Sequence, residues 1–295
     1  MEIIKTISHR KDAKPAKNNK KFLTLFAALR EKIVVLMDNL RFYGSPPFRV
    51  AVLHGGPGAP GEMAPVAREL AHDRGVLEPL QTADSVEGQV QELRGVLETR
   101  GDPPVTLIGW SWGAWLGYIL AARYPALVRK LILVGCPPLE DRYVAQIQST
   151  RLSRLTKDQR HELEDITAAL EDPSTKDSDA LLDRFGAMMS AADSFSPLPE
   201  DEEEIPVQFD IHHSVWSAAA AMRSSGELLE LGKQIRCPVV AIHGDYDPHP
   251  AEGVQKPLAL ILKDFRFILL PKCGHAPWRE REARDIFFKY LDKEI

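Results

Sequence analysis

The sequence predicts an α/β protein in which helices cover both faces of a mostly parallel β-sheet. Short apolar runs rich in β-branched residues alternate along the chain with stretches of helical periodicity. These runs are continuously apolar, which is typical of parallel strands buried on both faces. Between residues 138 and 236 the strand-like runs disappear, and the sequence becomes charged, helical and broken by prolines. This stretch predicts a helical insertion between two strands.

Strands and helices are expected in alternating order. The expected strands are residues 33–37, 48–53, 76–80, 105–108, 131–134, 239–242 and 265–270, and the expected helices are 65–74, 85–98, 112–124 and 251–262. The chain then divides into a basic N-terminal arm with a short helix (1–30), a first part of the core (31–137), a helical cap (138–236) and a second part of the core (237–295). Within the cap, the acidic run 200–204 is most simply a solvated loop, with ligand recognition as the alternative.

The amino-acid composition indicates which classes of partner the protein binds. Of 295 residues, 44% are hydrophobic and 27% charged, as in ordinary soluble globular proteins. The net charge of −5 gives no nucleic-acid signature. The longest apolar clusters, 22–29 and 33–37, fall short of the roughly 20 residues that a bilayer helix needs. We therefore expect a small-molecule substrate and no nucleic-acid or membrane partner, while the oligomeric state stays open.

The cysteines and the N-terminus indicate the compartment. Cys136, Cys237 and Cys273 are odd in number, far apart and without the spacing of a metal site. The short apolar stretch near the N-terminus is followed at once by the charged residues 30–32, unlike a secretory signal. We expect a cytoplasmic protein without structural zinc.

The motif GWSWG, residues 109–113, places a serine between an apolar strand and a helical stretch. A nucleophile elbow has the pattern G-x-S-x-G in this context of strand, tight turn and helix. The turn forces the serine into strained backbone angles and brings neighbouring backbone so close that Gly109 and Gly113 can carry no Cβ. The motif alone is also compatible with a glycine-rich packing turn, but its context favours Ser111 as a nucleophile.

A nucleophilic serine needs a base and an orienting acid, because its hydroxyl is a poor nucleophile at its free pKa. In this topology the acid and then the histidine follow the serine along the chain. His275 lies in a glycine loop after the last expected strand and is preferred as the base over His249 and His243. Asp247 is preferred as the acid over Asp245, because the glycine of GDYD turns the chain and two further residues let the chain swing back.

The segment HGGPGAPG, residues 54–61, follows an expected strand and precedes an expected helix. Acyl transfer needs donors for a developing oxyanion, and this architecture places one of them in such a loop. We assign the two donors to the backbone N–H groups of Gly56 and Trp112, the latter directly after the serine. Alone, a Gly/Pro loop is usually only a turn. Combined with the other motifs, it is interpreted as an oxyanion loop.

HGGPG, GWSWG, GDYD and CGH occur in an order that resembles the α/β-hydrolase superfamily, and within it the branch of proline iminopeptidases and related serine hydrolases. The resemblance runs from about Leu40 onward. It implies an α/β-hydrolase fold with an eight-stranded, mostly parallel sheet, helices on both faces and a helical cap. It also implies a triad of Ser111, Asp247 and His275, an oxyanion hole from Gly56 and Trp112, and no metal or organic cofactor.

The expected function is a serine hydrolase that cleaves an ester or amide bond of a small molecule or short peptide through an acyl-enzyme. An aminopeptidase of the proline iminopeptidase type and a carbon–carbon bond hydrolase are alternatives on the same triad, and a non-catalytic small-molecule receptor is a third. Family aminopeptidases carry a cap glutamate in a W-x-x-W-E pattern, whereas Trp216 is followed here by Ser217 and alanines. This departure counts against an aminopeptidase, unless glutamates of run 200–204 substitute.

Large side chains beside the serine and in the cap are candidates for an apolar substrate pocket. The main candidates are Trp110, Trp216, Phe185 and Phe195, followed by Trp112, Met188 and Met189. The cap residues among them could equally form a core.

Overall fold

The computed structural model describes residues 39–199 and 205–295. The expected N-terminal arm 1–30, the expected strand 33–37 and the acidic run 200–204 lie outside the described residues.

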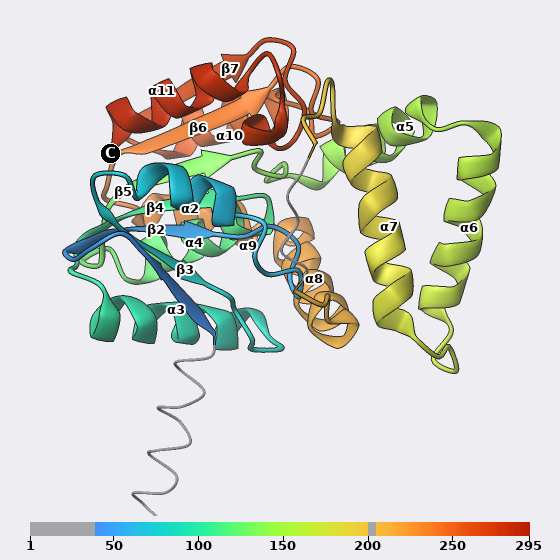
Figure 1. Cartoon of the computed structure of the whole chain (residues 1–295), viewed down its shortest axis with the longest axis horizontal. Coiled ribbons are helices and arrows are strands. Elements are labelled where there is room, and N and C mark those ends of the chain that lie inside the picture. Colours follow the sequence, from blue (N-terminus) through green and yellow to red (C-terminus); the bar gives the residue numbers. More distant parts are fainter. Residues whose placement is uncertain (1–38, 200–204) are drawn as a thin grey trace, which may run out of the picture. The chain divides into compact units, whose positions relative to one another are not determined.

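Seven strands of the described residues form one sheet in the order β1-β3-β2-β4-β5-β6-β7 (Figure 1). β1 (Leu40–Tyr43) runs antiparallel to β3 (Gly75–Pro79), and the other pairings are parallel. The remaining strands are β2 (Phe48–Leu53), β4 (Val105–Trp110), β5 (Val128–Val134), β6 (Val239–Gly244) and β7 (Phe265–Leu270). The mostly parallel sheet is confirmed, with seven described strands where eight were expected.

The strand β1 was not predicted. Its four residues are in turn buried, intermediate, exposed and intermediate. This pattern suits an antiparallel edge strand and lacks the continuous apolar run by which the buried strands were found.

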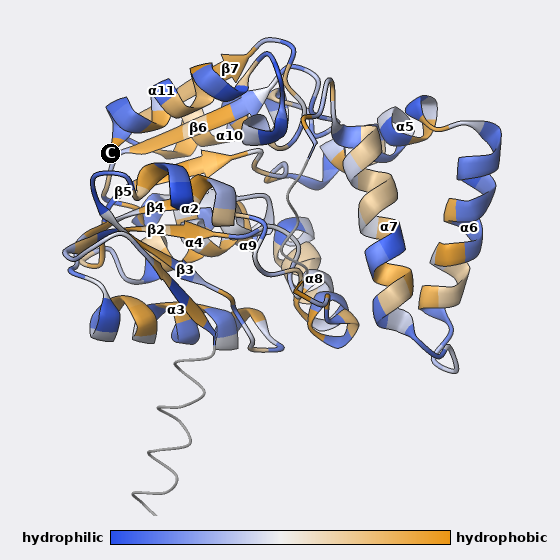
Figure 2. Ribbon diagram, in the orientation of Figure 1, coloured by the Kyte–Doolittle hydropathy of each residue, from blue (hydrophilic) through white to orange (hydrophobic). Residues whose placement is uncertain are grey.

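Helices cover both faces of the sheet. α2 (Ala64–Leu70) and α11 (Arg284–Glu294) share one apolar cluster with β2, β4, β5 and β6. α3 (Val86–Arg100), α4 (Trp112–Arg123) and α10 (Glu252–Ile261) lie on the opposite face (Figure 1). There Gly117 of α4 packs against Leu53, Leu107 and Leu131, the side chains that alternate with the first cluster. The strands in the middle of the sheet are accordingly mostly hydrophobic in Figure 2.

The helix α2 is shorter than predicted. It ends at Leu70 instead of residue 74, because the chain must reverse before β3 begins at Gly75. α3 begins one residue late for a local reason, since the Ser85 hydroxyl caps it by accepting the Gly88 N–H at 3.1 Å.

The insertion between β5 and β6 is helical, as predicted. It contains η1 (Asp141–Tyr143), α5 (Val144–Arg154), α6 (Lys157–Glu171), α7 (Ser178–Asp193), α8 (Phe209–Ser224), α9 (Glu227–Glu230) and η2 (Leu231–Gln234). The helices α5, α6 and α7 share a small apolar core of Leu155, Ile166, Met188, Met189 and Ala192. The last part returns to the sheet, where the Tyr118 hydroxyl of α4 donates to the Leu229 carbonyl at 3.0 Å.

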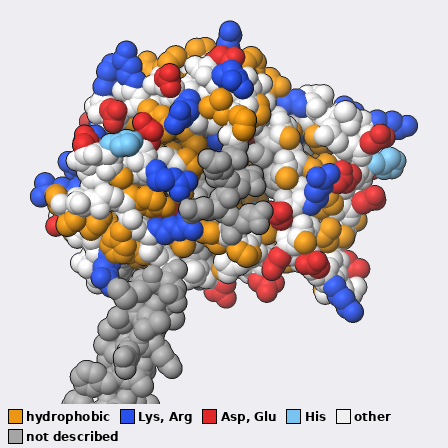
Figure 3. Space-filling view, viewed as in Figure 1, with side chains coloured by type: hydrophobic (Ala, Val, Ile, Leu, Met, Phe, Trp, Pro, Cys, Tyr) orange, Lys and Arg blue, Asp and Glu red, His pale blue; other side chains and the backbone are white. Residues whose placement is uncertain are grey.

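Charges of both signs are interspersed on the face seen in Figure 3. Within the described part of the chain, no helix combines the length and the apolar character that spanning a bilayer requires.

Candidate active site

Ser111 occupies a sharp turn between β4 and α4. Its backbone angles are φ 52° and ψ −116°, a strained region for a residue with a side chain. Two hydrogen bonds hold the turn: the Ser111 N–H donates to the Val134 carbonyl, and the Ser111 carbonyl accepts the Ala114 N–H, both at 3.0 Å. The residue remains partly exposed, which leaves its hydroxyl accessible.

The glycines on either side of Ser111 are required by close backbone packing. A Cβ on Gly109 would overlap the Gly113 carbonyl, and a Cβ on Gly113 would lie 2.6 Å from the His54 carbonyl oxygen. The turn therefore seats directly against the loop that follows β2.

The loops after β6 and β7 bring a carboxylate and an imidazole together. Nδ1 of His275 donates to Oδ2 of Asp247 at 2.8 Å. The neighbouring carboxylate of Asp245 instead accepts the backbone N–H of Cys273 at 3.2 Å, as expected of a turn aspartate. Of the two candidate acids, the structure places Asp247 against His275.

His275 is seated beside the serine turn. Its carbonyl accepts the indole N–H of Trp110 at 2.9 Å, and Trp110 directly precedes Ser111. A Cβ on Gly135 would lie 2.6 Å from the same carbonyl oxygen and 3.0 Å from Nδ1. Because Gly135 follows the residue that accepts the Ser111 N–H, the imidazole and the serine turn share one support.

Asp247 also binds a second histidine. Its Oδ1 accepts both the Nδ1–H of His249 at 2.7 Å and the His249 backbone N–H at 2.9 Å. The rings of His249 and His275 lie 4.5 Å apart, centroid to centroid. His243 completes the cluster, since its Nε2 donates to the His249 carbonyl at 2.8 Å and lies 3.6 Å from Oδ2 of Asp247.

The two histidines on Asp247 differ in basicity. Burial lowers the pKa of His275, but the Asp247 carboxylate outweighs it and raises that pKa above the ordinary value. Burial lowers the pKa of His249 to about 4 despite the same carboxylate. Burial opposes ionisation of Asp247 as well, yet the histidines around it hold its pKa well below the ordinary range. His275 is thus the stronger base, and Asp247 is an anion.

The loop after β2 presents its backbone to the serine turn. Gly56 has a φ of +22°, and its carbonyl accepts the Ala59 N–H at 2.8 Å. The buried His54 ring anchors the loop, with Nδ1 2.7 Å from the Gly55 carbonyl and Nε2 3.0 Å from the Leu80 carbonyl. Trp112 opens α4, where the first N–H groups have no acceptor within the helix. Its side chain is fully buried and donates to Gln89 at 2.8 Å.

Residues that sequence reasoning missed tie the insertion to the loops after β6 and β7. Arg154 of α5 donates to the Ala192 and Tyr246 carbonyls at 2.8 Å each, and its guanidinium lies over the Tyr246 ring. The buried Glu280 carboxylate accepts the N–H groups of Phe195, Ser196 and Gly274 at 2.7–3.0 Å. No motif links these residues, because their partners lie up to 92 positions away.

A buried ion pair lies at the same junction. Arg151 of α5 makes a two-pronged contact with the Asp193 carboxylate, at 2.8 and 2.5 Å. The Asp193 carbonyl accepts the His275 N–H at 3.1 Å. The end of α7 is therefore fixed to the imidazole loop.

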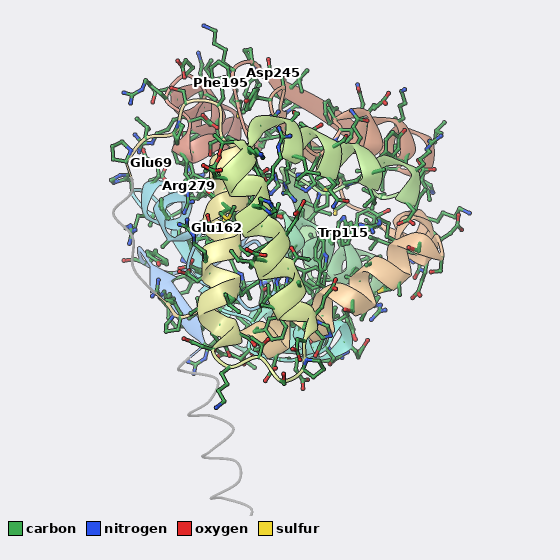
Figure 4. The ribbon with its side chains drawn as sticks, turned by 90° about the vertical axis from the view of Figure 1, so that its right-hand side faces the viewer. Glu69, Trp115, Glu162, Phe195, Asp245 and Arg279 are labelled. Atoms are coloured by element: carbon green, nitrogen blue, oxygen red, sulfur yellow. The ribbon has the colours of Figure 1, made fainter. Side chains whose placement is uncertain are left out.

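The four main pocket candidates have separate neighbours. Trp110 packs against His275 and Trp278, Phe185 packs on the α5–α7 core, Phe195 packs against Tyr246, and Trp216 stacks on Trp115. Among the described residues, no two of the four form a ring contact. In the view of Figure 4, Phe195 and Asp245 are drawn at the top of the molecule and Trp115 lies lower. Phe185 thus takes the core role that sequence reasoning left open.

The remaining large candidates pack inward. Trp112 is fully buried, and Met188 and Met189 belong to the α5–α7 core.

One group of the described residues brings possible metal ligands together. Ligand atoms of Asp247, His249 and His275 lie within 4.8 Å of one another. Nδ1 of both histidines is already hydrogen-bonded to the Asp247 carboxylate.

Comparison with known proteins defines the class of the chain. The sequence model described as the alpha/beta hydrolase family matches residues 21–286. The chain therefore belongs to the alpha/beta hydrolase family. A curated relative is the biotin biosynthesis bifunctional protein BioHC of Teredinibacter turnerae, 24% identical over 196 residues that cover 66% of this chain and 33% of that protein. The chain thus spans about a third of the length of this relative.

Solved structures share the fold. VinJ is 21% identical with a TM-score of 0.59, covering 87% of this chain and 95% of VinJ. The proline iminopeptidase of Mycobacterium smegmatis is 19% identical with a TM-score of 0.57, covering 86% and 94%. A meta-cleavage product hydrolase of Pseudomonas fluorescens is 16% identical with a TM-score of 0.57, covering 86% and 92%. At these identities the likeness concerns the fold alone.

Proposed function

We propose that the chain is a serine hydrolase that cleaves an ester or amide bond of a small molecule through an acyl-enzyme. The observation that carries the proposal is the 2.8 Å hydrogen bond between His275 and Asp247, supported next to the strained turn of Ser111. A nucleophile, a base and an orienting acid in one place are the minimum that acyl transfer by serine requires.

The proposed reaction begins with proton transfer. Nδ1 of His275 keeps its proton, which it donates in a hydrogen bond to Asp247. Nε2 is therefore the nitrogen that accepts the Ser111 proton as Oγ attacks the substrate carbonyl. Asp247 fixes the ring orientation and stabilises the imidazolium. His275 then protonates the leaving group, and water activated by the same nitrogen hydrolyses the acyl-enzyme.

The negative charge on the carbonyl oxygen needs fixed donors. The N–H groups of Gly56 and Trp112 are proposed as the oxyanion hole, since the first lies in the loop that seats against the serine turn and the second begins α4. Both are backbone groups, so they are preorganised by the fold.

The charge balance at the site favours a substrate without a free amine at the reacting end. An aminopeptidase needs an unpaired carboxylate to hold that amine. Among the described residues of the insertion, Asp193 contacts the backbone of His275, and its carboxylate is already paired with Arg151 through two hydrogen bonds. The acidic run 200–204 lies outside the described residues. We therefore propose an acyl ester or amide substrate, with the insertion 138–236 acting as the cap that covers it.

The nucleophile is tested with a fluorophosphonate probe. We expect the native chain to be labelled and Ser111→Ala to be unlabelled, with hydrolysis reduced by about 10⁵-fold or more. Ser153→Ala is the matched control, because this exposed serine bonds only to the Thr150 carbonyl of its own helix. Equal labelling of the native chain and Ser111→Ala would remove Ser111 from the mechanism.

The bond type is tested by turnover. Nitrophenyl acyl esters of increasing chain length are compared with proline nitroanilide, and we expect hydrolysis of the esters only. Preferred cleavage of the nitroanilide would instead assign the chain to the aminopeptidases. Saturable binding of these compounds without any product would favour a receptor.

A further inference from the structure

We propose that His249 is a positioning residue that acts through Asp247, holding the carboxylate in the one orientation that serves His275. The inference rests on the proposed function, in which His275 is the base. It assigns a task to a histidine that the three-residue mechanism does not use.

The carboxylate of Asp247 has two oxygens, and each has its own imidazole. Oδ2 accepts from His275 at 2.8 Å, while Oδ1 accepts two N–H groups of His249 at 2.7 and 2.9 Å. Rotation about the Cβ–Cγ bond would break all three hydrogen bonds together. Since the Asp247 side chain is fully buried, water cannot replace the lost donors. His249 therefore restricts the acid to a single rotamer.

A third histidine anchors His249 itself. The Nε2–H of His243 donates to the His249 carbonyl at 2.8 Å, and the His243 side chain is buried on β6. The loop that carries both Asp247 and His249 is thereby fixed to a central strand. Because the strands of the sheet are the least mobile part of the fold, this anchor restricts the motion of Asp247.

His249 acts as a neutral donor. A protonated His249 would weaken the attraction between the Asp247 carboxylate and a protonated His275. It would also repel the positive charge on His275, whose ring centroid is 4.5 Å away. Burial keeps His249 neutral by lowering its pKa to about 4. In the proposed reaction its Nδ1 proton stays in place, and the transferred proton moves only between Ser111 Oγ, His275 Nε2 and the leaving group.

Other charged and titratable groups also face this cluster. Arg151 approaches from α5, and Asp193 from the end of α7. The thiols of Cys136 and Cys273 lie near Asp247, and burial raises the pKa of both. These groups are unchanged in the variants below, so a shift between variants reports on His249.

Two kinds of substitution separate positioning from packing. His249→Asn places an amide N–H where Nδ1–H lies and keeps the donor to Asp247. His249→Leu fills the space with an apolar side chain and removes the Nδ1–H donor. If the leucine variant does not fold, His249→Phe is used in its place. His161→Asn is the matched control, because His161 is 74% exposed on α6.

We expect His249→Leu to lower kcat on a nitrophenyl ester by about 10- to 100-fold, the loss for one hydrogen bond to a charged group. KM should change little, while His249→Asn and His161→Asn retain most of kcat. The acidic limb of the kcat/KM profile should move to higher pH in His249→Leu, because a carboxylate with one donor fewer holds the His275 proton more tightly.

The pKa of the His275 imidazole is also followed by NMR in the Ser111→Ala background, where turnover plays no part. An upward shift of the His275 pKa in His249→Leu supports the role of His249 even if the chain proves not to be a hydrolase. If the native chain is neither labelled by the probe nor active on the esters, the proposed function is wrong. An unchanged His275 pKa in the leucine variant, or an equal loss of kcat in the asparagine and leucine variants, would overturn the role of His249.

Discussion

Gly135 determines where the imidazole of the proposed base can lie. It adopts a φ of +49°, and the space where its Cβ would stand is filled by the His275 carbonyl and ring. A side chain at this position would push His275 away from the serine turn. Gly135 carries no reactive group, yet its close packing determines how near His275 lies to the serine turn.

Gly135→Ala is expected to lower kcat by about 10²-fold, since a displacement of about 1 Å of a catalytic group has an effect of this size. The substitution also strains the backbone, so the free energy of unfolding should fall by about 1–2 kcal/mol. Steady-state kinetics and urea unfolding measure the two effects.

Gly95→Ala is the matched control. Gly95 lies within α3, and nothing stands within 4 Å of the position of its Cβ. Alanine there should leave kcat unchanged and raise the free energy of unfolding by up to about 1 kcal/mol. If Gly135→Ala leaves kcat as unchanged as Gly95→Ala does, the close packing of Gly135 against His275 does not affect activity.

At the residue scale, motif order in the sequence selected Asp247 and His275, which the structure joins by a hydrogen bond, while the role of Ser111 stays a prediction. Ser111, Asp247 and His275 each follow an apolar strand, and parallel strands bring their carboxyl ends to one edge. The second histidine on Asp247 was considered only as a rival base, because sequence spacing cannot show which oxygen of a carboxylate a side chain will bind. The pocket candidates were selected by size and position, which do not determine their neighbours.

The segment that follows α7 is held by one carboxylate. Glu280 lies between η3 (Pro277–Arg279) and α11 and accepts three backbone N–H groups, two from the segment after α7 and one from the loop of His275. It is 1% exposed, so none of these bonds is shared with bulk water. The contact couples the position of the insertion to that of the proposed base.

Glu280→Gln is expected to lower the free energy of unfolding by about 2–3 kcal/mol, because an amide has one acceptor oxygen and its NH₂ group would face an N–H donor. Hydrogen exchange at residues 195–198 should accelerate. Glu162→Gln is the matched control, since the Glu162–Arg184 pair on the insertion surface is exposed and screened by solvent, so its loss should change the free energy of unfolding little. Similar unfolding energies for the two variants would contradict a specific role for Glu280.

At the element scale, the buried strands and the helices on the sheet were predicted within a few residues. Their apolar runs are a direct consequence of being covered on both faces. The edge strand β1 and the end of α2 were not, because their limits depend on tertiary contacts and chain reversal. The hydrogen bonds from Arg154 and Glu280 to distant loops could not be predicted, because local sequence periodicity does not depend on them.

Three histidines with lowered pKa values make the described fold sensitive to acid. Burial lowers the pKa of His54, His212 and His249 below the ordinary 6.5. As the pH falls below that value, the unfolded chain binds protons that the folded chain excludes, so stability decreases. His275 acts in the opposite direction, since its raised pKa adds stability that is fully present below the ordinary value and is lost as the pH rises through the raised one.

Urea unfolding at pH 7.5, 6, 5 and 4.5 should therefore show a falling free energy of unfolding. His249 alone accounts for about 3 kcal/mol by pH 4, from the distance between its folded pKa and the ordinary value. His249→Asn should flatten this dependence. A free energy of unfolding that stays constant from pH 6.5 to 4.5 would contradict the burial of neutral imidazoles.

The small apolar core shared by α5, α6 and α7 has an evolutionary consequence. Helices that satisfy one another can change length and composition at their far end, around residues 172–177, while the strands keep their register. Descendants of this chain can therefore change this end of the insertion without moving the residues proposed for proton transfer, which follow β4, β6 and β7.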